Sequence, residues 1–175
     1  KVAQRRIDLV PRTRNQERLV LALQDSSQHI VVTVGPAGTG KTYLAMQAAV
    51  KALREGATDR IVMTRPAVGV EDERHGFLPG NLVAKMEPWT RPLLDVMREY
   101  YRPQDILAMI DDQVVEIAPL AFMRGRTFKN SWIIADEMQN ATPAQVKMLM
   151  TRIGSNSRIV ITGDVEQADR SHGDN

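Results

Sequence analysis

Hydrophobic and polar positions follow two different periods along this chain. Short apolar runs rich in β-branched residues, the pattern of buried strands, occur at 29–34, 60–64, 113–118, 131–136 and 158–164. Apolar residues recur at helical spacing over 15–24, 43–56 and 142–154, and over 82–101, where two prolines interrupt the pattern. Because strands alternate with helices, we expect an α/β fold with a mostly parallel sheet and helices on both faces.

Residues at the helix ends support these boundaries. Asn15 is expected to cap the first helix, and Gly56 to end the second. In the last helix, Thr142 and Gln145 have the spacing of a capping box, and Gly154 is expected to close it.

Composition narrows the class of protein. The chain has 175 residues, 43% of them hydrophobic and 25% charged, which is ordinary for one globular domain over residues 1–175. We expect no signal peptide, and no apolar run approaches the roughly 20 residues that span a bilayer. Cysteine is absent, which excludes disulfides and fits the reducing cytoplasm. The first residue is Lys1, so we expect a fragment of a longer protein.

The formal net charge is only +2, so nucleic-acid binding would require a local basic patch.

The stretch GPAGTGKT matches the phosphate-binding pattern G-x-x-x-x-G-K-[ST] between a predicted strand and a predicted helix. Glycines allow backbone N–H groups to surround phosphate oxygens, and the helix N-terminus adds partial positive charge. Lys41 is expected to reach the β- and γ-phosphates, and the Thr42 hydroxyl to bind Mg²⁺. The alternative is a glycine-rich turn that binds nothing. The candidate nucleotide-binding residues are Gly35, Pro36, Ala37, Gly38, Thr39, Gly40, Lys41, Thr42 and Tyr43.

Two adjacent carboxylates, Asp136 and Glu137, end the predicted strand in WIIADEMQN. A phosphate-binding loop needs a carboxylate near its Mg²⁺, and Asp136 is the candidate. Glu137 is then placed to activate the water that attacks the γ-phosphate. The plainer reading is a strand that simply reaches water at this point. An acidic pair favours hydrolysis over transfer of phosphate to a small-molecule acceptor.

Two glutamines are further candidates. Gln167 follows the fifth predicted strand, whose end should also lie near the phosphates, and could hydrogen-bond the γ-phosphate or its attacking water. Gln16 carries a donor and an acceptor suited to an adenine edge, although residue chemistry alone also fits an ordinary helix position.

Several motifs together resemble one family. GPAGTGKTYLA, TRPAVG, GFLPGNL, IAPLAFMRGRT, WIIADEMQN and RIVITGDVEQ are similar to those of the PhoH-like ATPases, in the same order from about residue 13 to 169. The resemblance implies one RecA-like P-loop NTPase domain, similar to the first motor domain of superfamily 1 helicases. It also implies ATP hydrolysis, rings that are often hexameric, and action on RNA. Under this resemblance Gln16 becomes an adenine reader.

Three arginines are candidates for a role beyond solubility. Arg65 follows the second predicted strand, where helicase-like domains bind single-stranded nucleic acid, so it is a candidate RNA phosphate contact. Arg124 and Arg126 flank a glycine in MRGRT. Either could reach a neighbouring subunit's ATP as an arginine finger, or bind an RNA phosphate.

Three hypotheses follow for the function. The first is a Mg²⁺-dependent ATPase that remodels single-stranded RNA as a homo-oligomeric ring and has no membrane partner. The second is a switch with slow turnover, whose ATP state controls partner binding. The third, a small-molecule kinase, is disfavoured by Glu137 and Gln167, and would consume ATP only with an acceptor present.

Overall fold

The computed structural model describes residues 6–66 and 90–166. Five strands form one sheet in the order β1-β5-β4-β2-β3, and every pair of neighbours is parallel. The strands are β1 (Ile30–Val34), β2 (Arg60–Arg65), β3 (Val115–Pro119), β4 (Ser131–Ala135) and β5 (Arg158–Gly163). The prediction of a parallel α/β sheet is confirmed.

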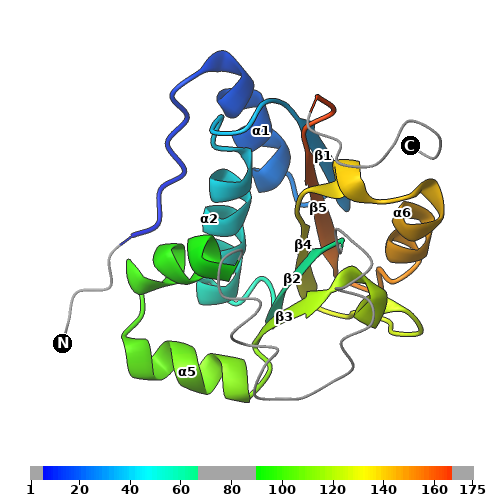
Figure 1. Ribbon diagram of the computed structural model, residues 1–175. Coiled ribbons are helices and arrows are strands. Elements are labelled where there is room, and N and C mark those ends of the chain that lie inside the picture. Colours follow the sequence, from blue (N-terminus) through cyan, green and yellow to red (C-terminus); the bar gives the residue numbers. More distant parts are fainter. Residues whose placement is uncertain (1–5, 67–89, 167–175) are drawn as a thin grey trace.

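Helices cover both faces of this sheet, as expected (Figure 1). The α-helices are α1 (Arg14–Gln24), α2 (Lys41–Arg54), α5 (Pro103–Asp111) and α6 (Pro143–Met150), and residues 90–98 are also helical. Two short 3₁₀ helices are η1 (Leu120–Met123) and η2 (Met138–Asn140). No helix within the described residues is long and apolar enough to cross a membrane.

Alternate residues of each strand build two hydrophobic cores. Met63, Ile134 and Val160 point to the face that α1, α2 and α5 cover, whereas Ile133 and Ile159 point to the face of η1 and α6. This alternation follows from the two-residue period of a strand. Both faces of the central strands are therefore buried, which explains why their sequences read as continuous apolar runs.

Small residues let α2 lie close to the sheet. Ala45 and Ala49 are fully buried, and Val50 beside them is also inaccessible. Because α2 begins directly after the glycine-rich loop, this packing fixes the helix N-terminus near the carboxyl ends of the strands.

Several predicted boundaries are wrong. Thr13, not Asn15, caps α1, because its backbone is extended and its hydroxyl accepts a hydrogen bond from Gln16 N at 3.2 Å. The capping box of Thr142 and Gln145 is present, but α6 ends at Met150. Gly154 does not close that helix.

Gly154 instead allows two chain segments to come together. Its N–H donates to the carbonyl oxygen of Phe128 at 2.7 Å. A Cβ at this position would lie 2.5 Å from the same oxygen, so any other residue would force the backbone to shift. The chain after α6 thus packs directly against the segment that leads into β4.

Helix α5 has no counterpart among the expected elements. Pro103 opens it, and only Ile106 of its residues is buried. The third strand also begins later than expected, because Gln113 has a left-handed backbone (φ 57°) and lies before β3. Gly56, with φ 74°, follows α2 as expected.

Candidate nucleotide-binding site

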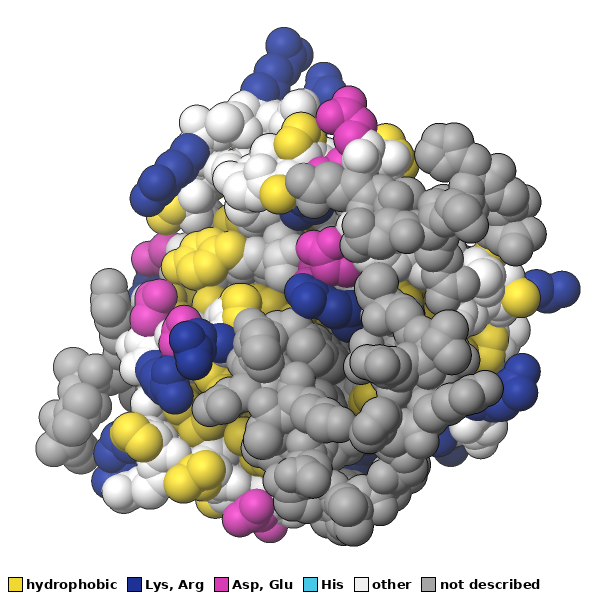
Figure 2. Space-filling view, viewed as in Figure 1, with side chains coloured by type: hydrophobic (Ala, Val, Ile, Leu, Met, Phe, Trp, Pro, Cys, Tyr) yellow, Lys and Arg dark blue, Asp and Glu magenta, His cyan; other side chains and the backbone are white. Residues whose placement is uncertain are grey.

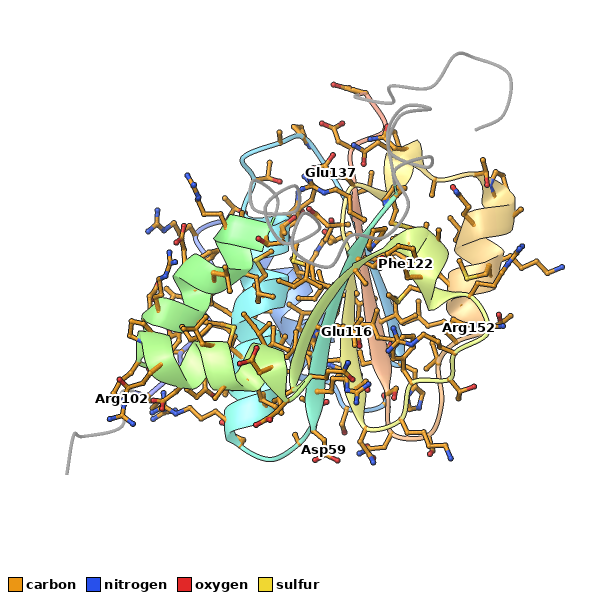
Figure 3. The ribbon with its side chains drawn as sticks, turned by 60° about the horizontal axis from the view of Figure 1, so that its bottom comes forward. Asp59, Arg102, Glu116, Phe122, Glu137 and Arg152 are labelled. Atoms are coloured by element: carbon orange, nitrogen blue, oxygen red, sulfur yellow. The ribbon has the colours of Figure 1, made fainter. Side chains whose placement is uncertain are left out.

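The candidate site lies where the parallel strands end. Residues 35–40 connect β1 to α2, and Asp136 and Glu137 directly follow β4. In Figure 3, Glu137 lies at the opposite end of the strands from Asp59, which precedes β2. Because all five strands are parallel, their carboxyl ends lie at the same end of the sheet, and ligands of open α/β sheets bind there.

The glycine-rich loop has the backbone that its sequence predicts. Gly38 and Gly40 have φ of 76° and 80°, a region that suits glycine. Within the loop, Lys41 Nζ and Thr39 Oγ1 both donate to the carbonyl oxygen of Pro36, at 2.8 and 2.9 Å. The lysine ammonium therefore lies over the loop that is expected to hold phosphates.

Two contacts hold the loop against the rest of the fold. Gly35 N donates to Gly163 O, at the end of β5, at 3.1 Å. Gln16 Nε2 donates to Thr39 O at 2.8 Å, and Gln16 Oε1 accepts from Arg12 N at 2.7 Å. A Cβ on Gly40 would lie 3.0 Å from Gln16 Nε2. The structure thus brings Gln16 to the loop, although its expected contact with adenine remains a prediction.

Asp136 lies at the centre of a hydrogen-bond network. Its Oδ1 accepts from Thr42 Oγ1 at 2.9 Å and from Thr162 Oγ1 at 2.5 Å, and its Oδ2 accepts from Arg65 at 2.7 Å. The residue is only 3% exposed. A hydroxyl and a carboxylate are the oxygen ligands that Mg²⁺ prefers, so Thr42 and Asp136 fit the expected metal site.

Glu137 has an unusual backbone. Its φ of 55° and ψ of 38° are left-handed, which is uncommon for a residue other than glycine, and such outliers cluster at functional sites. Gln139 Nε2 donates to Glu137 Oε2 at 2.5 Å, and Gln139 Oε1 accepts from Asp164 N at 3.0 Å. Gln139 thus connects the carboxylate to the end of β5 and limits its orientations.

Sequence patterns do not single out Thr162 or Gln139. The nearest signal for Gln139 is its position two residues after Glu137 in WIIADEMQN. Thr162 is a polar residue inside an apolar strand, and it is 1% exposed. A buried hydroxyl in such a strand needs a polar partner, which here is Asp136.

The predicted arginines lie in different surroundings. Arg65 reaches Asp136, as described above. Arg126 makes two hydrogen bonds to Glu116, at 2.5 and 2.8 Å, and its guanidinium lies 4.5 Å from the centre of the Phe128 ring. The hydrogen bonds to Glu116 raise the pKa of Arg126. Arg124, which follows η1, is exposed.

The remaining candidates complete the picture. Tyr43, in the first turn of α2, is 45% exposed. Burial raises the pKa of the Tyr43 hydroxyl, and the nearby Glu99 raises it further. Pro36 and Ala37 form the exposed tip of the loop. Gln167 lies outside the described residues.

Residues 8–175 match the family described as PhoH-like protein. The chain belongs to this family. It is 50% identical over 159 residues to a PhoH-like protein of Mycobacterium tuberculosis, covering 91% of this chain and 44% of that protein. It is 46% identical over 162 residues to a PhoH-like protein of Bacillus subtilis, covering 93% of this chain and 50% of the relative.

Protein PhoH of Escherichia coli is 40% identical over 162 residues, covering 91% of this chain and 46% of that protein. This PhoH-like chain therefore spans about half the length of the curated relatives it matches.

A solved structure confirms the type of fold. The SWI2/SNF2 ATPase core of Sulfolobus solfataricus, in complex with dsDNA, matches 93% of this PhoH-like chain and 34% of its own chain, with a TM-score of 0.54. Sequence identity is 13%, so the likeness concerns the fold alone. The expected α/β fold of P-loop ATPases is thereby confirmed.

A cavity in this PhoH-like chain lies away from the candidate site. Its volume is about 440 Å³, and its lining includes Leu23, Thr58, Trp132 and Arg158. Thr58 precedes β2, Trp132 is the second residue of β4, and Arg158 is the first residue of β5. The cavity is therefore at the amino ends of the strands, and none of the loop or acidic-pair residues lines it.

Proposed function

We propose that this PhoH-like chain binds ATP with Mg²⁺ and hydrolyses it. The observation that carries the proposal is the 2.9 Å contact between Thr42 Oγ1 and Asp136 Oδ1, which joins the glycine-rich loop to the acidic pair. These residues are 94 positions apart in the chain, and a phosphate-binding loop beside a strand-end carboxylate is the common arrangement of P-loop NTPases.

Each residue of the proposed site has a distinct role. Lys41 and the loop N–H groups bind the phosphates, Thr42 and Asp136 hold the metal, and Gln16 reads the adenine. Bound Mg²⁺ would supply positive charge to the phosphate oxygens. Glu137 accepts a proton from the attacking water, and its left-handed backbone and its bond to Gln139 keep it oriented. Gln167 is assigned to the γ-phosphate from sequence alone.

We further propose that ATP hydrolysis drives the remodelling of single-stranded RNA by a homo-oligomeric ring. The ring is hexameric by family resemblance. A single motor domain needs a neighbour to complete its ATP site, and Arg124 is exposed and suited to reach one. Arg126 is the second candidate for this contact. Figure 2 shows acidic and basic side chains interspersed on the visible face, so an RNA contact would be local. A cytoplasmic location and one domain over residues 1–175 complete the proposal.

The test is steady-state ATP hydrolysis with and without single-stranded RNA, with the oligomeric state recorded in the same buffer. The control is Lys41→Ala, which removes the phosphate contact and should abolish hydrolysis. We expect RNA to raise the rate of ATP hydrolysis, and the active species to be a ring. Slow hydrolysis that is indifferent to RNA would leave the ATPase but favour the switch. Hydrolysis equal in wild type and the lysine variant would refute the proposed site.

A further inference from the structure

Arg65 lies at the metal site, not at a free surface. It is the last residue of β2, and Asp136 follows β4, the neighbouring strand. Asp136 N donates to the carbonyl oxygen of Thr64 at 2.9 Å, which aligns the two strand ends. The Arg65 guanidinium then donates to Asp136 Oδ2 at 2.7 Å, with 31% of the arginine side chain and 4% of the aspartate side chain exposed.

The two oxygens of Asp136 have different kinds of partner. Oδ1 accepts from the hydroxyls of Thr42 and Thr162, which are neutral. The Thr42 hydroxyl can donate to Oδ1 and still present a lone pair to a cation. Arg65 on Oδ2 has no lone pair to offer, and its charge repels a metal ion. Oδ2 is therefore the atom for which an arginine and a metal would compete.

The burial of Asp136 makes this competition direct. A carboxylate that is 3% exposed needs a positive partner, because burying an unpaired charge is costly. Lys41 Nζ binds the carbonyl oxygen of Pro36, so Arg65 is the cation that an observed contact assigns to Asp136 among the described residues. A divalent ion at Thr42 and Asp136 would take over the same role.

We propose that Arg65 is a built-in competitor of Mg²⁺ at Asp136, and that it leaves Oδ2 when the metal and nucleotide bind. This inference rests on the proposed function, because it uses the same metal site. It assigns to Arg65 a regulatory role that does not depend on RNA. Metal affinity is then set by how readily the guanidinium leaves, and removing the guanidinium should strengthen metal binding.

The test measures Mn²⁺ binding in the presence of ADP, by the loss of the electron paramagnetic resonance signal of free Mn²⁺. We expect Arg65→Gln to raise Mn²⁺ affinity about fivefold or more. The control is Arg60→Gln, the same substitution at the other end of β2, where Arg60 lies 3.8 Å from Glu116. It should leave Mn²⁺ affinity unchanged. Unchanged or weaker Mn²⁺ binding in Arg65→Gln would overturn the inference.

Two further measurements keep the test decisive. Arg65→Lys keeps a cation but cannot copy the planar guanidinium, so a smaller rise in Mn²⁺ affinity is expected, and no rise would count against competition. The Arg65→Lys variant also provides the test if Arg65→Gln does not fold. Binding of Mn²⁺ with ADP is also independent of turnover. Stronger Mn²⁺ binding without any ATP hydrolysis would therefore refute the proposed activity and support the role of Arg65, and no Mn²⁺ binding in any variant would refute both.

Discussion

At the scale of single residues, two neighbouring carboxylates occupy different environments. Asp136 is buried and surrounded by two hydroxyls and an arginine, whereas Glu137 is partly exposed and held by an amide. The left-handed backbone of Glu137 turns the chain immediately after β4, so that the two side chains do not share partners. This separation supports the proposed division of roles, in which Asp136 holds the metal and Glu137 activates the attacking water.

Glu137→Gln tests that division. The amide keeps the shape of the side chain but is a very poor base, so ATP turnover should fall by about 10²-fold or more while ATP affinity stays near that of the wild type. Turnover is measured by phosphate release and affinity by titration calorimetry. Glu55→Gln, an exposed position after α2, is the matched control and should change neither. Near-normal turnover in Glu137→Gln would show that Glu137 is not the general base.

At the scale of elements, close backbone contacts hold the strands and connections in place. The segment before β4 runs parallel to the chain after α6, where Phe128 pairs with Ile153 beside Gly154. The same segment carries Arg126, which binds Glu116 of β3. The hydrogen bonds and the ring of Phe128 give Arg126 a structural function in the fold. Its role as an arginine finger stays a prediction, which would require it to leave Glu116.

Gly154→Ala should destabilise the protein. The added Cβ would lie 2.5 Å from the carbonyl oxygen of Phe128, and the backbone must move to accept it. We expect the free energy of unfolding to fall by about 1–3 kcal/mol, the range for overpacked sites. Urea denaturation provides the measurement. Ser155→Ala, at the exposed neighbouring position, should stay within about 0.5 kcal/mol of wild type. An equally small change in Gly154→Ala would show that the close contact with Phe128 adjusts easily.

These elements also show what sequence can and cannot predict. The strands and the glycine-rich loop are recognisable because hydrophobic period and turn chemistry are local properties. The α6 capping box is predictable for the same reason, since its partners are three residues apart. The partner of Arg65 is 71 positions away in the chain and depends on which strands become neighbours. Helix α5 has only nine residues, which is shorter than the stretch over which helical periodicity becomes distinctive.

At the scale of the whole molecule, the order of strands places the proposed RNA contact beside the proposed metal ligand. Strand β2 lies beside β4, so the arginine expected to contact an RNA phosphate is also the arginine that binds Asp136. A guanidinium paired with a buried carboxylate is less available to a phosphate. If Mg²⁺ and nucleotide release Arg65, they should also strengthen RNA binding, and linkage requires RNA to strengthen their binding by the same factor.

The prediction is a nucleotide-dependent affinity for RNA. In the wild type, ADP with Mg²⁺ should tighten binding of a fluorescent oligouridylate by about fivefold or more, measured by anisotropy at one salt concentration. In Arg65→Gln the affinity for the oligouridylate should be weaker than that of the wild type with ADP and Mg²⁺. It should be nearly the same with and without ADP and Mg²⁺, because no guanidinium remains to be released. Arg60→Gln should behave as wild type. An equal effect of nucleotide in Arg65→Gln and wild type would show that the coupling runs through other residues, and that Arg65 acts on the metal alone.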